Sequence, residues 1–115
     1  MSVDAVLATA REFARNELRP VALEYDETEE YPEEIVEKAA ALGLTCYDLP
    51  AEHGGGGIDS LLDNVLVLEE LNWGDSPISM CIAQGGFFAA PILAMGTAEQ
   101  CERWVAPLCG PRPAC

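Results

Sequence analysis

The sequence predicts an all-α protein, and three observations support this fold class. Apolar residues recur at steps of three and four over most of the chain, which places them on one face of a helix. No long stretch alternates apolar and polar residues, as a half-buried strand would. Half of the 115 residues are hydrophobic and only 23% are charged, so the chain has enough apolar material for a core. This length fits one domain, residues 1–115, folded as a bundle of about five helices.

The first helix is expected over residues 3–25. Its apolar positions are Val3, Val6, Leu7, Ala10, Phe13, Ala14, Leu18, Val21, Ala22 and Tyr25. Pro20 lies inside this pattern and removes one backbone donor. We therefore expect a kink at Pro20 or two abutting helices.

A shorter second helix is expected within "EYPEEIVEKAAALGL". Pro32 lies near its first turn, and Gly43 follows its last apolar residue. The next segment, "TCYDLPAEHGGGGI", has no helical period and contains Pro50 and four consecutive glycines. It is predicted to be a loop.

Three further elements complete the bundle. A third helix is expected from residue 59 or 60 to Asn72, with its apolar side formed by Leu61, Leu62, Val65, Leu66, Leu68 and Leu71. A fourth is expected over the uncharged residues 76–98, bent or divided by Pro91. The last is short and starts at Thr97, whose spacing from Gln100 is that of a capping box.

The charge of the chain excludes some partners. Acids outnumber bases 20 to 6, which gives a net charge of -14. Nucleic acids and anionic membrane surfaces both require basic residues, so neither is an expected partner. The uncharged residues 76–98 are long enough to cross a membrane, but Gln84, the pair Gly85-Gly86 and Pro91 favour a helix buried inside a larger protein.

The cysteines argue against metal binding and secretion. Five cysteines form no CxxC pair, and there is one histidine, so no metal ligand is expected. Cys46 and Cys81 have apolar neighbours and are expected to be small core residues. The N-terminus has no signal-peptide pattern, and a reducing, cytoplasmic location is the expectation.

The four glycines raise the question of a phosphate-binding loop. Such a loop needs a strand before the glycines and usually a Lys after them. The preceding "YDLPAEH" is a poor strand, and no Lys or Arg lies between Lys38 and Arg103. The glycines are therefore predicted to form a turn with positive φ and close backbone approach, with His53 as a turn residue. The Glu69-Glu70 pair is assigned a structural role.

Several pieces of the sequence occur together and in order in one known family. They are "LGL" at residues 42–44, "PAEHGG" at 50–55, "LEEL" at 68–71, and the turn Gly74-Asp75. The flanks "REFARNELRPVALEYDETEEYP" and "AAPILAMGTAEQCERWVAPLCG" agree with the same family. In this combination the chain resembles the N-terminal helical domain of acyl-CoA dehydrogenases. It departs from the family in its fourth glycine and in "CGPRPAC" at residues 109–115.

The resemblance implies a fragment of a longer flavoprotein that lacks the family's β domain and C-terminal helical domain. The intact enzyme would use a glutamate to remove the α proton of an acyl-CoA and pass the β hydride to FAD. The resemblance places both the flavin contacts and this base after Cys115, so we assign no catalytic or cofactor-binding residue and expect the chain alone to be inactive. An electron-transfer partner and an oligomeric state are implied for the full-length protein.

The fourth helix carries the only proposed site. By resemblance it lines the acyl pocket, and Met80, Ala83, Gln84 and Phe87 share one face at helical spacing. Simple core packing of all four is the alternative. Phe87 and Phe88 would favour short or flat acyl groups. Other functions left open are a relative acting on nitroalkanes, and a non-catalytic acidic helical interaction module or partner subunit.

Overall fold

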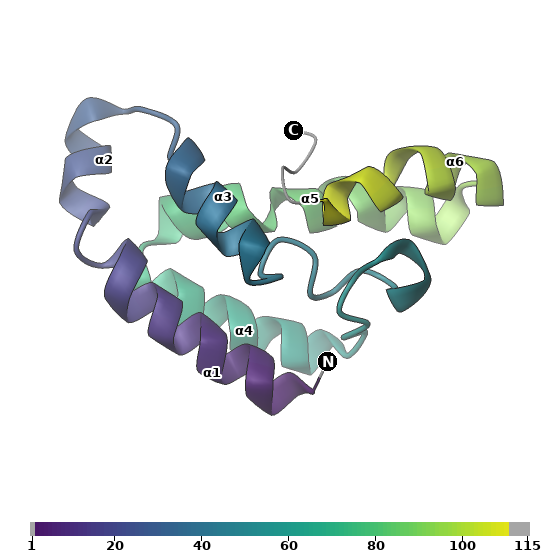
Figure 1. Ribbon diagram of the computed structural model, residues 1–115, viewed down its shortest axis with the longest axis horizontal. Helices are drawn as coiled ribbons and strands as arrows, with labels where there is room; N and C mark the ends of the chain where they lie inside the picture. Colours follow the sequence, from purple (N-terminus) through teal and green to yellow (C-terminus); the bar gives the residue numbers. More distant parts are fainter. Residues whose placement is uncertain (1, 111–115) are drawn as a thin grey trace.

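The computed structural model describes residues 2–110, and over that range the chain is built of helices without strands (Figure 1). The α-helices are α1 (Val3–Phe13), α2 (Ala22–Thr28), α3 (Glu33–Ala41), α4 (Leu61–Gly74), α5 (Ser76–Met95) and α6 (Ala98–Trp104). The all-α prediction is confirmed. The departure from the family at "PRPAC", residues 111–115, lies outside the described residues.

The main core lies where α1 and α4, side by side in Figure 1, meet α3 and the first turns of α5. Ser2 begins α1 by accepting a hydrogen bond from the Ala5 N–H at 3.3 Å. We call the buried residues of this core the large cluster; they are Val6, Ala10, Phe13, Ala14, Leu18, Ile35, Val36, Ala39, Leu44, Tyr47, Ile58, Val67, Leu71, Ile78 and Ile82.

The chain breaks into two helices at Pro20, which is the second of the two outcomes expected there. Residues Ala14–Leu18 form one wide π-helical turn, in which the Arg19 N–H donates to the Ala14 carbonyl at 2.9 Å. The chain then turns and restarts as the separate helix α2. Because Pro20 has no N–H to donate, it favours a break in the helix at this position. The sequence predicted the break but not the wide turn before it.

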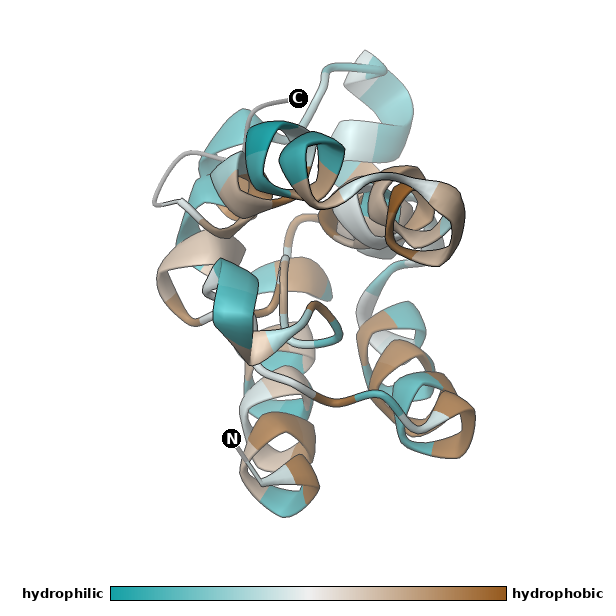
Figure 2. Ribbon diagram, turned by 90° about the vertical axis from the view of Figure 1, so that its right-hand side faces the viewer, coloured by the Kyte–Doolittle hydropathy of each residue, from teal (hydrophilic) through white to brown (hydrophobic). Residues whose placement is uncertain are grey.

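The predicted apolar side of α4 is wrong in its first half. Leu61 and Leu62 are 79% and 67% exposed, whereas Val67, which the pattern did not select, is fully buried. Figure 2 shows hydrophobic residues along most of α4, and these include the exposed residues of its first turns. The residues of this helix are apolar on nearly all sides, so their spacing does not distinguish the face that packs on α1.

Helix α5 is a single helix, and Pro91 does not divide it. Asp75 begins it by accepting a hydrogen bond from the Ile78 N–H at 2.9 Å. Among the described residues, α5 is the helix long and apolar enough to cross a membrane, and 22% of its most apolar window is buried. The core helix of a larger protein can have the same length and composition.

The chain ends as predicted with a capped short helix and a second, smaller core. Thr97 and Gln100 form the full capping box, with bonds of 2.9 and 3.2 Å. Residues Ala106–Cys109 then form a 3-10 turn. We call the buried group that joins this turn to α5 and to the loop after α3 the small cluster; it contains Cys46, Leu49, Ala89, Val105 and Leu108.

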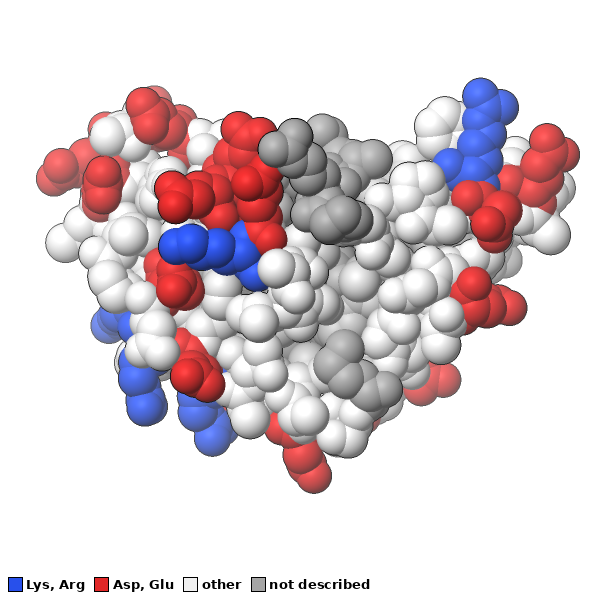
Figure 3. Space-filling view, in the orientation of Figure 1, with Lys and Arg blue, Asp and Glu red and all other residues white. Residues whose placement is uncertain are grey.

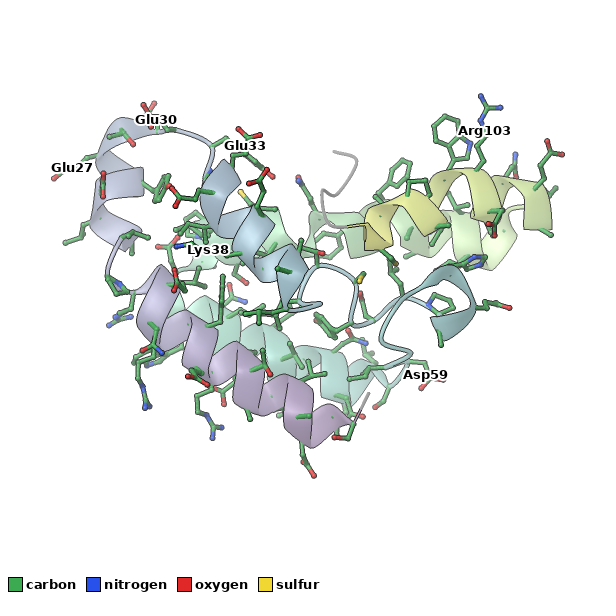
Figure 4. All side chains as sticks on the ribbon, in the orientation of Figure 1. Glu27, Glu30, Glu33, Lys38, Asp59 and Arg103 are labelled. Atoms are coloured by element: carbon green, nitrogen blue, oxygen red, sulfur yellow. The ribbon has the colours of Figure 1, made fainter. Side chains whose placement is uncertain are left out.

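One group of acidic residues lies at the end of the molecule formed by α2 and α3. Figure 3 shows this group, and Glu27, Glu30 and Glu33 point outward there in Figure 4. Lys38 lies beside them and pairs with Glu17 at 2.9 Å. A run of acids of this kind is typical of a solvated surface.

Candidate functional site

The four residues predicted to line a pocket lie on one open face of α5. Met80 and Phe87 are 47% and 58% exposed, and Ala83 and Gln84 between them are half-buried. The Gln84 amide donates to the Tyr31 hydroxyl at 3.0 Å, which ties this face to the loop between α2 and α3. Core packing of all four within this chain is therefore excluded.

Two hollows in the surface lie at either end of this face. One, of about 400 Å³, lies between the α2–α3 loop and the start of α5 and is lined by residues that include Tyr25, Tyr31 and Cys81. The other, of about 540 Å³, lies between α5 and α6, beside Phe88 and Trp104. None of the four predicted residues lines either hollow. These linings could not be predicted from local sequence patterns, because they require the packing of α2 and α6 against α5.

The glycine turn cannot bind a phosphate, because its donors are already used. The N–H groups of Gly54 to Gly57 donate to loop carbonyls at 2.9 to 3.1 Å. Gly54 and Gly57 have positive φ. A Cβ on Gly55 would lie 2.2 Å from the Leu49 carbonyl oxygen, and one on Gly56 would lie 2.6 Å from that of Tyr47. Both parts of the prediction, positive φ and close backbone approach, are confirmed.

His53 connects the glycine turn to α6. It ends a 3-10 turn, Ala51–His53, and its side chain is 12% exposed. Its Nδ1 lies 3.5 Å from a carboxylate oxygen of Glu102. The assignment of His53 as a turn residue is confirmed.

The partly buried carboxyl of Asp48 and the thiols of Cys46 and Cys109 lie close to the glycine turn. Burial raises the pKa of Asp48, whose carboxylate packs against the backbone of Gly86 on α5. Burial likewise raises the pKa of the Cys46 thiol, and raises that of Cys109 to about 12. Desolvation disfavours the charged form of each group, so the two thiols are slow nucleophiles at neutral pH.

The glutamate pair on α4 is structural, as the sequence indicated. Glu70 forms an ion pair with Arg11 of α1, which lowers the pKa of Glu70, while Glu69 is exposed. Within residues 2–110, no group of His, Cys, Asp and Glu side chains has an arrangement that could hold a metal ion.

Comparison with known proteins identifies the family. The sequence model of the acyl-CoA dehydrogenase N-terminal domain matches residues 2–111. The chain therefore belongs to the acyl-CoA dehydrogenase family and corresponds to its N-terminal domain.

Two relatives show how the similarity is distributed. The mitochondrial short-chain specific acyl-CoA dehydrogenase of Sus scrofa is 35% identical over 100 residues, which cover 86% of this chain and 24% of the relative. A 3-(aryl)acrylate reductase of Clostridium sporogenes is also 35% identical over 100 residues, which cover 26% of its length. The chain thus spans about a quarter of the length of these relatives.

Two solved structures have the same fold. Butyryl-CoA dehydrogenase from Megasphaera elsdenii superposes with a TM-score of 0.80 at 27% identity, over 95% of this chain and 29% of that one. A chain from a structural study of the electron transferring flavoprotein of Acidaminococcus fermentans superposes with a TM-score of 0.82 at 29% identity, over 93% of this chain and 28% of that one.

Proposed function

We propose that this chain is the N-terminal helical domain of a flavin-dependent oxidoreductase that acts on the Cα–Cβ bond of an acyl-CoA thioester. The observation that carries the proposal is the family match over residues 2–111. The similarity to a short-chain specific acyl-CoA dehydrogenase over 86% of the chain supports a short acyl group. The activity is proposed for the whole protein, of which this chain would be about a quarter by comparison with those relatives.

In this proposal, the α5 face contributes one wall of the acyl-chain site. The openness of Met80 and Phe87 supports it, because a contiguous exposed apolar surface commonly marks a ligand groove or an interface. Gln84 holds the face against Tyr31 and so fixes its position relative to the α2–α3 loop. Phe87 and the adjacent Phe88 fill space that a long acyl chain would need, which favours short or flat groups.

The described residues do not form a complete FAD site. The pyrophosphate of FAD is usually bound by free backbone N–H groups or by basic side chains. The N–H groups of the glycine turn are all used, and Arg11, Arg15 and Arg19 lie on α1 and the turn after it. In this proposal, the phosphate contacts of the flavin belong to other parts of the protein.

A second candidate is the reverse reaction on an aryl-substituted substrate. The 3-(aryl)acrylate reductase is as similar to this chain as the short-chain dehydrogenase is, at 35% identity over the same number of residues. The two exposed phenylalanines Phe87 and Phe88 suit contact with a flat ring.

The test is to express the gene together with its own downstream sequence and purify the product. We expect bound flavin that a short acyl-CoA reduces, which bleaches its absorbance. If the second candidate holds, flavin first reduced with dithionite should be reoxidised by an aryl acrylate. A soluble product without flavin would refute both candidates and favour the acidic interaction module. Residues 1–115 expressed alone are expected to bind no FAD.

The role of α5 is tested separately in the flavin-loaded protein. Ala83→Trp should shift the preference towards shorter acyl groups, because it places a large ring at the centre of the open face. Ala8→Trp, at an exposed position of α1, is the matched control and should leave the preference unchanged. A folded Ala83→Trp variant with normal preference would remove this face from the substrate site.

A further inference from the structure

Two cysteines that are distant in the sequence meet in the small cluster. Cys46 lies in the loop after α3 and is 7% exposed. Cys109 is the last residue of the 3-10 turn Ala106–Cys109, is half-buried, and packs against the small cluster. The two side chains therefore share one small apolar cluster.

The glycine turn holds both cysteines in place. The carbonyl of Cys46 accepts a hydrogen bond from the Gly56 N–H at 3.0 Å. On the other side of the turn, a Cβ on Gly54 would lie 3.3 Å from the Cβ of Cys109. The two cysteines therefore lie against one compact turn.

We propose that Cys46 and Cys109 form an intramolecular disulfide when the protein meets a low-molecular-weight disulfide such as oxidised glutathione. The thiolate of one cysteine attacks the sulfur of the oxidant, and the first glutathione leaves as a thiol. The thiolate of the other cysteine then displaces the second glutathione. Two protons and two electrons leave the protein, and the oxidant is reduced to two thiols.

The other described cysteines are held elsewhere. Cys101 lies on α6, and its thiol donates to the Ile92 carbonyl at 3.6 Å. Cys81 lies on α5 beside the hollow formed with α2. Of the described cysteines, Cys46 and Cys109 are the two that share the small cluster, so oxidation should be selective for them. Their raised pKa values make the reaction slow at neutral pH and faster as the pH rises.

The disulfide would connect two segments that lie far apart in the sequence. It would join the loop after α3 to the 3-10 turn that precedes Gly110, and close a long loop of chain between them. A cross-link over a long loop stabilises a protein mainly by restricting its unfolded chain. The oxidised protein should therefore melt at a higher temperature, by roughly 10 °C.

The test uses the 115-residue chain carrying Cys115→Ser, so that Cys109 is the only cysteine near the C-terminus. The protein is incubated with oxidised glutathione, alkylated, and digested after glutamate without reduction. Cleavage after Glu37, Glu52, Glu99 and Glu102 places Cys46 and Cys109 in separate peptides, each free of the other cysteines. We expect one dominant linked pair, joining residues 38–52 to residues 103–115, formed faster at about pH 9 than at about pH 7.

Two variants serve as controls and separate the loss of the disulfide from poor folding. Cys101→Ser should keep both the linked pair and the rise in Tm, whereas Cys109→Ser should lose both. Glutathione adducts without the linked pair would overturn the proposal, and so would equal amounts of links to Cys81 or Cys101. A linked pair without any rise in Tm would refute the stabilisation and leave the disulfide standing.

Discussion

The two hydrophobic clusters of this chain are built differently. The large cluster is formed mainly by side chains of α1, α3, α4 and α5, and the segment between α3 and α4 adds Leu44, Tyr47 and Ile58. The small cluster joins one turn of α5 to two irregular segments, the loop after α3 and the 3-10 turn Ala106–Cys109. It contains five buried residues, against fifteen in the large cluster.

This difference indicates where the chain opens first. The large cluster gains its stability from buried apolar area, which is spread over many contacts. The small cluster has few apolar contacts and lies beside two other features, the close approach of Gly55 to the Leu49 backbone and the desolvated carboxyl of Asp48. Regions with few apolar contacts open at lower free energy than the global core. We therefore expect the small cluster to exchange its amide hydrogens faster than α1 and α4.

The largest effect should come from the large cluster. Leu71→Ala removes a fully buried side chain and is expected to lower the free energy of unfolding by about 3 kcal/mol. Leu61→Ala on the same helix is the matched control, because Leu61 is 79% exposed and its loss should have little effect. Urea denaturation of both variants measures the difference. Equal losses would mean that α4 packs on a different face.

The glycine turn should give the next largest effect, in the small cluster. Gly55→Ala is expected to cost about 2 kcal/mol, because its Cβ would overlap the Leu49 carbonyl. Gly57→Ala has space for a Cβ but a φ of +74°, and should cost about 1 kcal/mol. Denaturation midpoints of the two variants separate close approach from backbone strain. A harmless Gly55→Ala would show that the loop can move away.

Asp48 should give a smaller effect that depends on pH. Its pKa is raised in the folded state, so the folded carboxyl holds its proton more tightly than the unfolded one. The proton on Asp48 therefore stabilises the folded state at low pH, and this stability is lost as the pH rises through the raised pKa. Asp48→Asn should raise stability at neutral pH by up to about 1 kcal/mol. The gain should disappear below the ordinary pKa of aspartate, and thermal melts across the acidic range would measure it.

The smallest effect should come from the ion pair between Arg11 and Glu70. The pKa of Glu70 is lowered, so the pair contributes at neutral pH and loses its contribution as the pH falls through that lowered value. Because Arg11 is 61% exposed, the contribution should be near the detection limit. Glu70→Gln should cost slightly more than Glu69→Gln at low salt, and the difference should vanish at high salt. A large, salt-independent loss would contradict a surface ion pair.

Much of the fold could be predicted because its signals are local. The break at Pro20, the cap at Thr97 and the turn at the four glycines each follow from residues close together in the sequence. The buried face of α4 could not be predicted, because the helix is apolar on nearly all sides and only its packing on α1 selects Val67. The wide turn Ala14–Leu18 was missed because its hydrogen bonding has no local sequence pattern.

The candidate site was predictable to a similar degree. Helical spacing placed Met80, Ala83, Gln84 and Phe87 on one face, and that face is open. The hollows beside it depend on where α2 and α6 lie against α5, which spacing within one helix does not reveal. Whether the face binds an acyl chain stays a prediction for the longer protein.

Positive and negative charges are unevenly distributed over the molecule. Eight of the 20 acidic residues lie between Glu24 and Glu37, on α2, α3 and the loop between them, while Arg11, Arg15 and Arg19, half of the six basic residues, follow one another along α1 and the turn after it. The chain therefore has an electric dipole moment in addition to its net charge of -14. An approaching charged surface exerts a torque on such a molecule before any contact forms. A positively charged surface should meet the α2–α3 end first, so that the orientation of the chain is set during the approach.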